Sequence, residues 1–70
     1  MAVWECMEML GKHKKVMILT ERGKKQISER LSAYEYKLYA DEFPREVFEP
    51  ILEKTAKTVD LEEMTIYCEE

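Results

Sequence analysis

The sequence is poor in the residue types on which enzymes and metalloproteins depend: among 70 residues it has one histidine, two cysteines, two glycines and two prolines. His13 lies between lysines in a polar stretch, where we expect a solvated imidazole with no carboxylate to orient it. Structural zinc takes a tetrahedral set of Cys and His ligands, more than the three such residues in the chain. We therefore expect no metal and no cofactor.

Motifs for catalysis are also missing. The sequence contains no CxxC, no HExxH, no glycine-rich phosphate loop and no EF-hand pattern. Turnover also needs a cleft, and a chain of 70 residues leaves little room for one. We expect no catalytic residue and predict that the protein is not an enzyme.

Cys6 and Cys68 lie near opposite ends of the chain. In a reducing compartment they are most simply two half-buried strand residues. A disulfide between them would close nearly the whole chain and add about 4 kcal/mol through the entropy of the unfolded state. Sequence alone leaves their redox state open.

Long apolar runs are absent, and none approaches the roughly 20 residues that a membrane helix needs. The first ten residues, MAVWECMEML, carry two glutamates and no basic residue, so they do not resemble a secretory signal. With so little glycine and proline, flexible linkers are not expected. We predict one domain over residues 1–70, in the cytoplasm and without a membrane segment.

What the chain does have is 46% hydrophobic and 37% charged residues, the composition of a folded domain. In residues 3–10, VWECMEML, side chains alternate as in a strand, and residues 15–20, KVMILT, are also strand-like. The polar residues 11–14 between them predict a turn, and hence an antiparallel hairpin. Met, Leu and Glu are also good helix formers, so a helix over 3–10 stays open.

A helix is predicted next, with Thr20 as its N-cap. Its apolar stripe repeats at spacings of 4, 3 and 4 and consists of Ile27, Leu31, Tyr34 and Leu38. Gly23 in the first turn costs about 1 kcal/mol, so the regular helix would begin at Lys24. Cations surround this start, where a helix prefers anions.

Residues 41–60 form a second helical region by the spacing of their apolar side chains. Pro44 suits a first turn, whereas Pro50 in the interior removes a hydrogen bond, so we expect a helix kinked or split at Pro50. The apolar arc is wider than the ordinary stripe of about 100° and must pack on two surfaces. A chain this small gains stability from a partner subunit, so we predict a homodimer.

Residues 64–68, MTIYC, alternate as a third strand would. Together these segments predict a small α+β domain of order β-β-α-α-β, with its helices against one face of a sheet. The run VMILTERGKKQISERL resembles the wing strand and following helix of MarR- and PadR-type winged-helix regulators, at Leu19, Thr20, Glu21, Gly23, Ile27 and Leu31. The helix-turn-helix of those regulators precedes the wing, and only 15 residues stand before this run, so the resemblance implies no DNA reading.

Charge is distributed unevenly along the chain. Residues 1–34 hold seven Lys or Arg against four Glu, a net +3, and residues 35–70 hold four against eleven Asp or Glu, a net −7. The leading hypothesis is a small regulator that binds another protein. One form is an inhibitor whose acidic half occupies the basic site of a nucleic-acid-binding protein, and in size and charge the chain looks like DNA-mimicking proteins of phages. The candidate contacts are Asp41, Glu42, Glu46, Glu49, Glu53, Asp60, Glu62 and Glu63.

The alternative hypothesis is direct binding of nucleic acid by a basic strip. Phosphate contacts would then explain the cations around Gly23. The strip consists of Lys12, Lys14, Lys15, Arg22, Lys24 and Lys25. On the helical wheel Tyr36 points away from the apolar stripe, as an interface anchor would. The candidate interface residues are Tyr36, Tyr39, Phe48 and Leu52.

Overall fold

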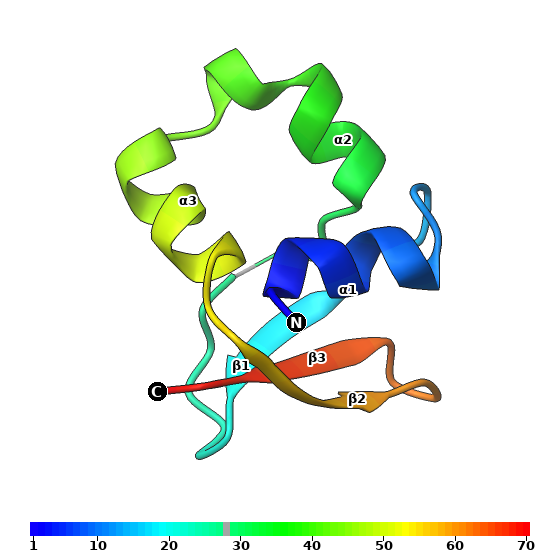
Figure 1. Ribbon diagram of the computed structural model, residues 1–70. Coiled ribbons are helices and arrows are strands. Elements are labelled where there is room, and N and C mark those ends of the chain that lie inside the picture. The colour runs from blue at the N-terminus through cyan, green and yellow to red at the C-terminus, as the bar shows by residue number, and fades with distance from the viewer. Residues whose placement is uncertain (28) are drawn as a thin grey trace.

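The computed structural model describes residues 1–27 and 29–70, and within them the chain forms helices on one side of a mixed three-stranded sheet (Figure 1). The elements are α1 (Val3–Leu10), β1 (Met17–Thr20), α2 (Ala33–Leu38), the 3-10 helix η1 (Ala40–Glu42), α3 (Arg45–Leu52), β2 (Ala56–Asp60) and β3 (Thr65–Cys68). The predicted α+β class is confirmed. The order of elements differs from β-β-α-α-β, and the differences have local causes.

Residues 3–10 form helix α1, and the predicted strand is wrong. Val3, Cys6 and Met7 are the buried residues of this segment, and their spacing of i, i+3 and i+4 places them on one side of a helix. Gly11 follows with φ of 126°, a conformation that residues with a side chain rarely adopt, and it ends the helix.

Thr20 ends β1 and begins a tight turn instead of capping a helix. The Gly23 backbone N–H donates to the Thr20 carbonyl over 2.8 Å, and Gly23 has φ of 83°. A glycine closing a turn in this way needs no helix after it. The predicted helix start at Lys24 is therefore wrong, and the helix begins only at Ala33.

After this turn the chain runs back along the outer edge of β1. The Gln26 N–H donates to the Ile18 carbonyl over 3.0 Å, and isolated bridges join Leu19 to Lys25 and Val16 to Leu31. β1 thus forms its local hairpin with the segment that follows it. The predicted hairpin between residues 3–10 and 15–20 is wrong.

The region 41–60 divides into part of η1, then α3 and β2, instead of forming one helical unit. Pro44 is the N-cap of α3, and Pro50 lies inside α3, which ends two residues later. The helix is therefore not split at Pro50. The β-branched residues Thr58 and Val59 lie in β2, where branching at Cβ is favourable.

The strand order is β1-β3-β2, with β1 parallel and β2 antiparallel to β3. The strand predicted over 64–68 is β3, and it occupies the centre of the sheet. Its Ile66 lies opposite Ile18 on one side and Val59 on the other. Pairing between β2 and β3 is interrupted by an irregularity between Ala56 and Thr58.

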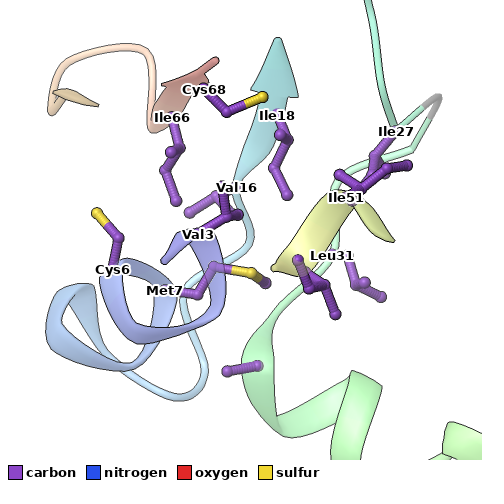
Figure 2. Packing of buried hydrophobic residues seen from close by; sticks show 12 residues of the cluster. Val3, Cys6, Met7, Val16, Ile18, Ile27, Leu31, Ile51, Ile66 and Cys68 are labelled. Carbon is purple, nitrogen blue, oxygen red and sulfur yellow. The ribbon is translucent and has the colours of Figure 1, made fainter. Parts of the chain in front are cut away.

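The hydrophobic core lies between α1 and the sheet, and α3 and the segment before α2 close its side. Figure 2 shows Val3 of α1 directed at Val16, with Ile18 of β1 and Ile66 of β3 beyond it, and the end of the Met7 side chain directed toward Leu31. Helices α2, η1 and α3 form an arc beyond α1 (Figure 1). No helix in the described part of the chain is long and apolar enough to cross a membrane.

Candidate binding groove

A groove of about 240 Å³ opens between the three α-helices. Each helix contributes residues at positions i, i+3 and i+4, so one side of each helix faces the groove. The lining residues are Trp4, Met7 and Glu8 from α1, Ala33, Tyr36 and Lys37 from α2, and Glu49, Leu52 and the C-cap Glu53 from α3.

The floor of the groove is apolar and buried. Met7, Ala33 and Leu52 belong to the core cluster, so neighbours on several elements hold them in place. Trp4, the one tryptophan of the chain, remains 42% exposed beside them. An apolar group placed here would leave water without any rearrangement of the core.

The rim carries three carboxylates and one ammonium group. Lys37 pairs with Glu8 and links α2 to α1, and its hydrogen bond holds the pKa of the Glu8 carboxyl below the usual value. Glu49 has only a loose ion pair, with Arg45 Nε at 3.8 Å from Oε1, and Glu53 is exposed. The α3 side of the groove is therefore negatively charged.

An aromatic cluster positions α2 relative to α3. Tyr36 stacks on Phe43 with ring centroids 5.7 Å apart, and Phe43 meets Phe48 edge-on at 5.2 Å. Tyr36 packs against the core, whereas the helical wheel predicted that it points outward. The wheel was wrong because η1 and α3 fold back over that side of α2.

No protein-family model, curated protein or solved structure matches this chain. The local resemblance to winged-helix regulators ends at strand β1, since a turn and a return segment follow it in place of a helix. The groove and the charged surfaces around it are therefore the basis for a functional proposal.

The predicted acidic surface lies in two separate places. Along η1, α3 and its C-cap stand Asp41, Glu42, Glu46, Glu49 and Glu53. The turn between β2 and β3 holds the rest, and there Asp60 Oδ1 accepts the N–H groups of Glu62 and Glu63 at 3.0 and 3.2 Å. Figure 1 shows this turn and α3 at opposite ends of the molecule. Of the whole set, Glu49 and Glu53 line the groove.

The predicted basic strip is divided as well. Lys12, Lys14 and Lys15 precede β1, and Arg22, Lys24 and Lys25 follow it. A strand of four residues spans about 13 Å, so the two groups lie at opposite ends of β1. Lys15 is further occupied by an ion pair of 3.3 Å between its Nζ and Glu35 Oε1. The six cations do not form one strip.

A second groove of about 280 Å³ has the apolar residues Ile27, Leu31, Phe43 and Phe48, bordered by Lys15, Glu29, Arg30, Glu35 and Tyr39. Its two cations already have partners. Lys15 pairs with Glu35, and the Arg30 guanidinium donates to the carbonyls of Glu63 at 2.8 Å and Met64 at 3.2 Å. Among the described residues each groove has one carboxylate without an ion pair, Glu29 here and Glu53 between the α-helices. The groove between the α-helices differs in having Trp4 in its lining.

The candidate interface residues differ in how far a partner could reach them. Tyr39 is exposed, Phe48 is half-buried, and Leu52 is buried in the core. Leu52 was predicted to face a second copy, but the C-terminal end of α3 turns it inward. Leu38 and Val47, which were not singled out, are each 55% exposed.

The two thiols are free and buried, and burial raises the pKa of both Cys6 and Cys68. Cys6 lies on a helix and not on a strand, and Figure 2 shows the two sulfur atoms directed away from each other. His13 is exposed with its ring centroid 4.6 Å from that of Tyr34. Among residues 1–27 and 29–70, no three His, Cys, Asp or Glu are placed to hold a metal ion.

Sequence reasoning found the α3 side of the groove and missed the α1 side. Trp4, Met7 and Glu8 are not among the candidate site residues, because a strand over 3–10 puts Met7 on the opposite face from Trp4 and Glu8. Their spacing of i, i+3 and i+4 is the signal that indicates a shared helical face.

Proposed function

We propose that this protein is a small non-catalytic regulator that binds another protein through the groove between α1, α2 and α3. One observation carries the proposal: Trp4 stands half-exposed beside a buried apolar floor. Tryptophan in such pockets is among the residue types that contribute most to protein interfaces. Small-molecule pockets usually occupy about 300–1,000 Å³, so this smaller groove better suits one or two side chains of a partner.

We infer that the partner surface is basic. Glu49 of α3 and its C-cap Glu53 line one side of the groove, and opposite charge accelerates encounter and selects partners. In its most specific form the proposal is an inhibitor that occupies the basic site of a nucleic-acid-binding protein, as a DNA mimic would. Asp60, Glu62 and Glu63 lie outside this surface.

We also propose that the chain forms a homodimer in the cytoplasm. Leu38 and Val47 are exposed apolar side chains of α2 and α3 that a second copy would cover. The two free thiols fit a reducing compartment. Light scattering over a range of concentrations is the test, and a monomer mass throughout would contradict the dimer.

The binding proposal is tested by affinity capture with matched variants. Trp4→Ser removes the exposed aromatic from the groove, and Leu61→Ser makes a comparable change in the β2–β3 turn. We expect wild type and Leu61→Ser to retain one dominant basic protein, and Trp4→Ser to lose it. Equal capture by both variants would contradict the groove as the binding site.

The same preparations test direct nucleic-acid binding by gel shift. A complex with duplex DNA or RNA that dissociates steeply as salt rises would favour the alternative function. We expect no shift at about 50 mM salt, because the basic residues are divided and the rim of the groove is acidic.

A further inference from the structure

The edges of the sheet leave little room for a partner strand. On the outer edge of β1, Lys25 bridges Leu19 and Leu31 bridges Val16, and the Gln26 N–H donates to the Ile18 carbonyl. The start of β2 is covered by the N-terminus, where the Ala56 N–H donates to the Met1 carbonyl over 2.8 Å and Ala2 bridges Thr55. The pairing irregularity between Ala56 and Thr58 contains Lys57, and an irregularity and a lysine at a sheet edge both discourage strand addition. Among the common ways of binding a peptide, insertion of a helix into a groove fits this molecule best.

The α3 side of the groove sets a spacing for the partner's charges. Glu49 and Glu53 are four residues apart, so they lie one helical turn apart on the same side of α3, with Cβ atoms about 6 Å from each other. Two lysines or arginines at i and i+4 of a partner helix have the same spacing. Glu8, the third carboxylate of the rim, already has Lys37 as its partner.

The apolar part of the groove sets the size of the anchor. The whole groove, about 240 Å³, admits one or two large side chains of a helix that lies across its rim. Such a side chain would contact Met7, Leu52 and Trp4. On a partner helix, an apolar residue three or four positions from a lysine lies beside it on the same face.

We infer that a basic amphipathic helix of the partner protein docks across the groove. One large apolar side chain enters the groove, and two cations one turn apart face Glu49 and Glu53. This inference rests on the proposed function and names the class of segment that the regulator recognises. It also accounts for the negative charge of α3 beside an otherwise apolar site.

Fluorescence of Trp4 provides the experiment, because it is the one tryptophan of the chain and lines the groove. The probe is a helical peptide of leucine and lysine with lysines one turn apart. We expect a saturable change in emission that weakens as salt rises. Peptides with glutamate in place of lysine, or with a central proline that breaks the helix, are expected to bind at least tenfold more weakly.

Matched double variants test whether Glu49 and Glu53 bind the lysines of the peptide. Glu49→Gln with Glu53→Gln is expected to weaken binding about three- to tenfold, since each exposed ion pair contributes little. Glu62→Gln with Glu63→Gln makes the same change of charge in the β2–β3 turn and is expected to leave binding unchanged.

The inference is overturned if Trp4 emission does not respond to the lysine peptide. It is also overturned if the glutamate or proline peptide binds as tightly, or if both pairs of variants behave alike. The two proposals can fail separately. If Trp4→Ser loses the partner in affinity capture but the lysine peptide does not change Trp4 emission, the proposed function stands and only the basic-helix inference is overturned.

Discussion

Ser32 determines where α2 begins, and so positions the α2 side of the groove. Its Oγ accepts the N–H of Glu35 at 3.1 Å, and the Glu35 carboxylate accepts the N–H of Ser32 at 3.1 Å. Ser32→Ala removes this cap and is expected to lower the free energy of unfolding by about 1 kcal/mol in urea denaturation. Ser32→Thr keeps the hydroxyl as a control, and an equal loss in both variants would argue against a capping role.

Two glutamates link stability to pH. The pKa of Glu8 is lowered by its hydrogen bond from Lys37, and that of Glu35 by its hydrogen bond from the Ser32 backbone. A carboxyl group with a lower pKa in the folded state stabilises the fold above its unfolded pKa and loses this effect as pH falls. We expect urea denaturation to show a loss of stability that begins near pH 4.3, about the unfolded value, and continues to below the lowered values. Glu8→Gln with Glu35→Gln is expected to flatten this slope, and an unchanged slope would contradict the assignment.

The two thiols are expected to be unreactive in the folded protein. Both are buried and have raised pKa values, so little thiolate is present near neutral pH. A chromogenic disulfide reagent is therefore expected to label neither Cys6 nor Cys68 quickly under native conditions, and both after denaturation. Fast labelling of the native chain would show that the core around α1 and β3 opens readily.

At the scale of elements, strands rich in residues of high β propensity are predicted correctly from the sequence. The prediction is wrong for the segment whose apolar pattern fits both a strand and a helix. Residues 17–20 and 65–68 lie within predicted strands. Residues 3–10 satisfy a period of two and the spacing of a helix at once. The choice between strand and helix depends on which side chains are buried, and the buried ones are Val3, Cys6 and Met7, which share one side of a helix.

The helix predicted after Thr20 is absent from the described residues that precede Ala33, and local preferences in its sequence already conflict with it. It required Gly23 in a first turn and cations at a helix N-terminus, each of which is locally unfavourable. In the structure Gly23 closes a turn and the cations lie in a loop, so both conflicts disappear. Segments whose local preferences conflict with a predicted element are the ones to doubt.

Pro50 lies at the sixth position of α3, where its ring removes a backbone donor for the Glu46 carbonyl. Pro50→Ala is expected to raise the free energy of unfolding by about 1–2 kcal/mol, because the regained hydrogen bond and relieved clash exceed the added entropy of the unfolded chain. Chemical denaturation measures the change. Pro44→Ala at the N-cap lacks this gain and serves as the control. A destabilised Pro50→Ala would mean that the proline fixes the end of α3 in a way that alanine does not.

At the scale of the molecule, the sequence predicted the charges but not their grouping. The sequence predicts one surface for each of the acidic and basic sets, yet β1 separates the basic residues and β2 separates the acidic ones. The parallel pairing of β1 with β3 joins segments far apart in the chain, and no local pattern encodes it. Only Glu49 and Glu53 of the predicted acidic residues therefore lie at the candidate groove.

Stability of the whole chain depends on the small core around β3. A domain this short has a net stability of only about 3–5 kcal/mol, and Ile66 is fully buried in the central strand. Ile66→Ala removes about 2–5 kcal/mol, enough to unfold most of the protein, which circular dichroism and urea denaturation would detect. Ile66→Val costs about 0.5–1.5 kcal/mol and is expected to stay folded. A cooperative and nearly unchanged urea transition for Ile66→Ala would show that the stability of the fold comes from another source. If that source is a dimer that dissociates only on unfolding, the urea midpoint will rise with protein concentration.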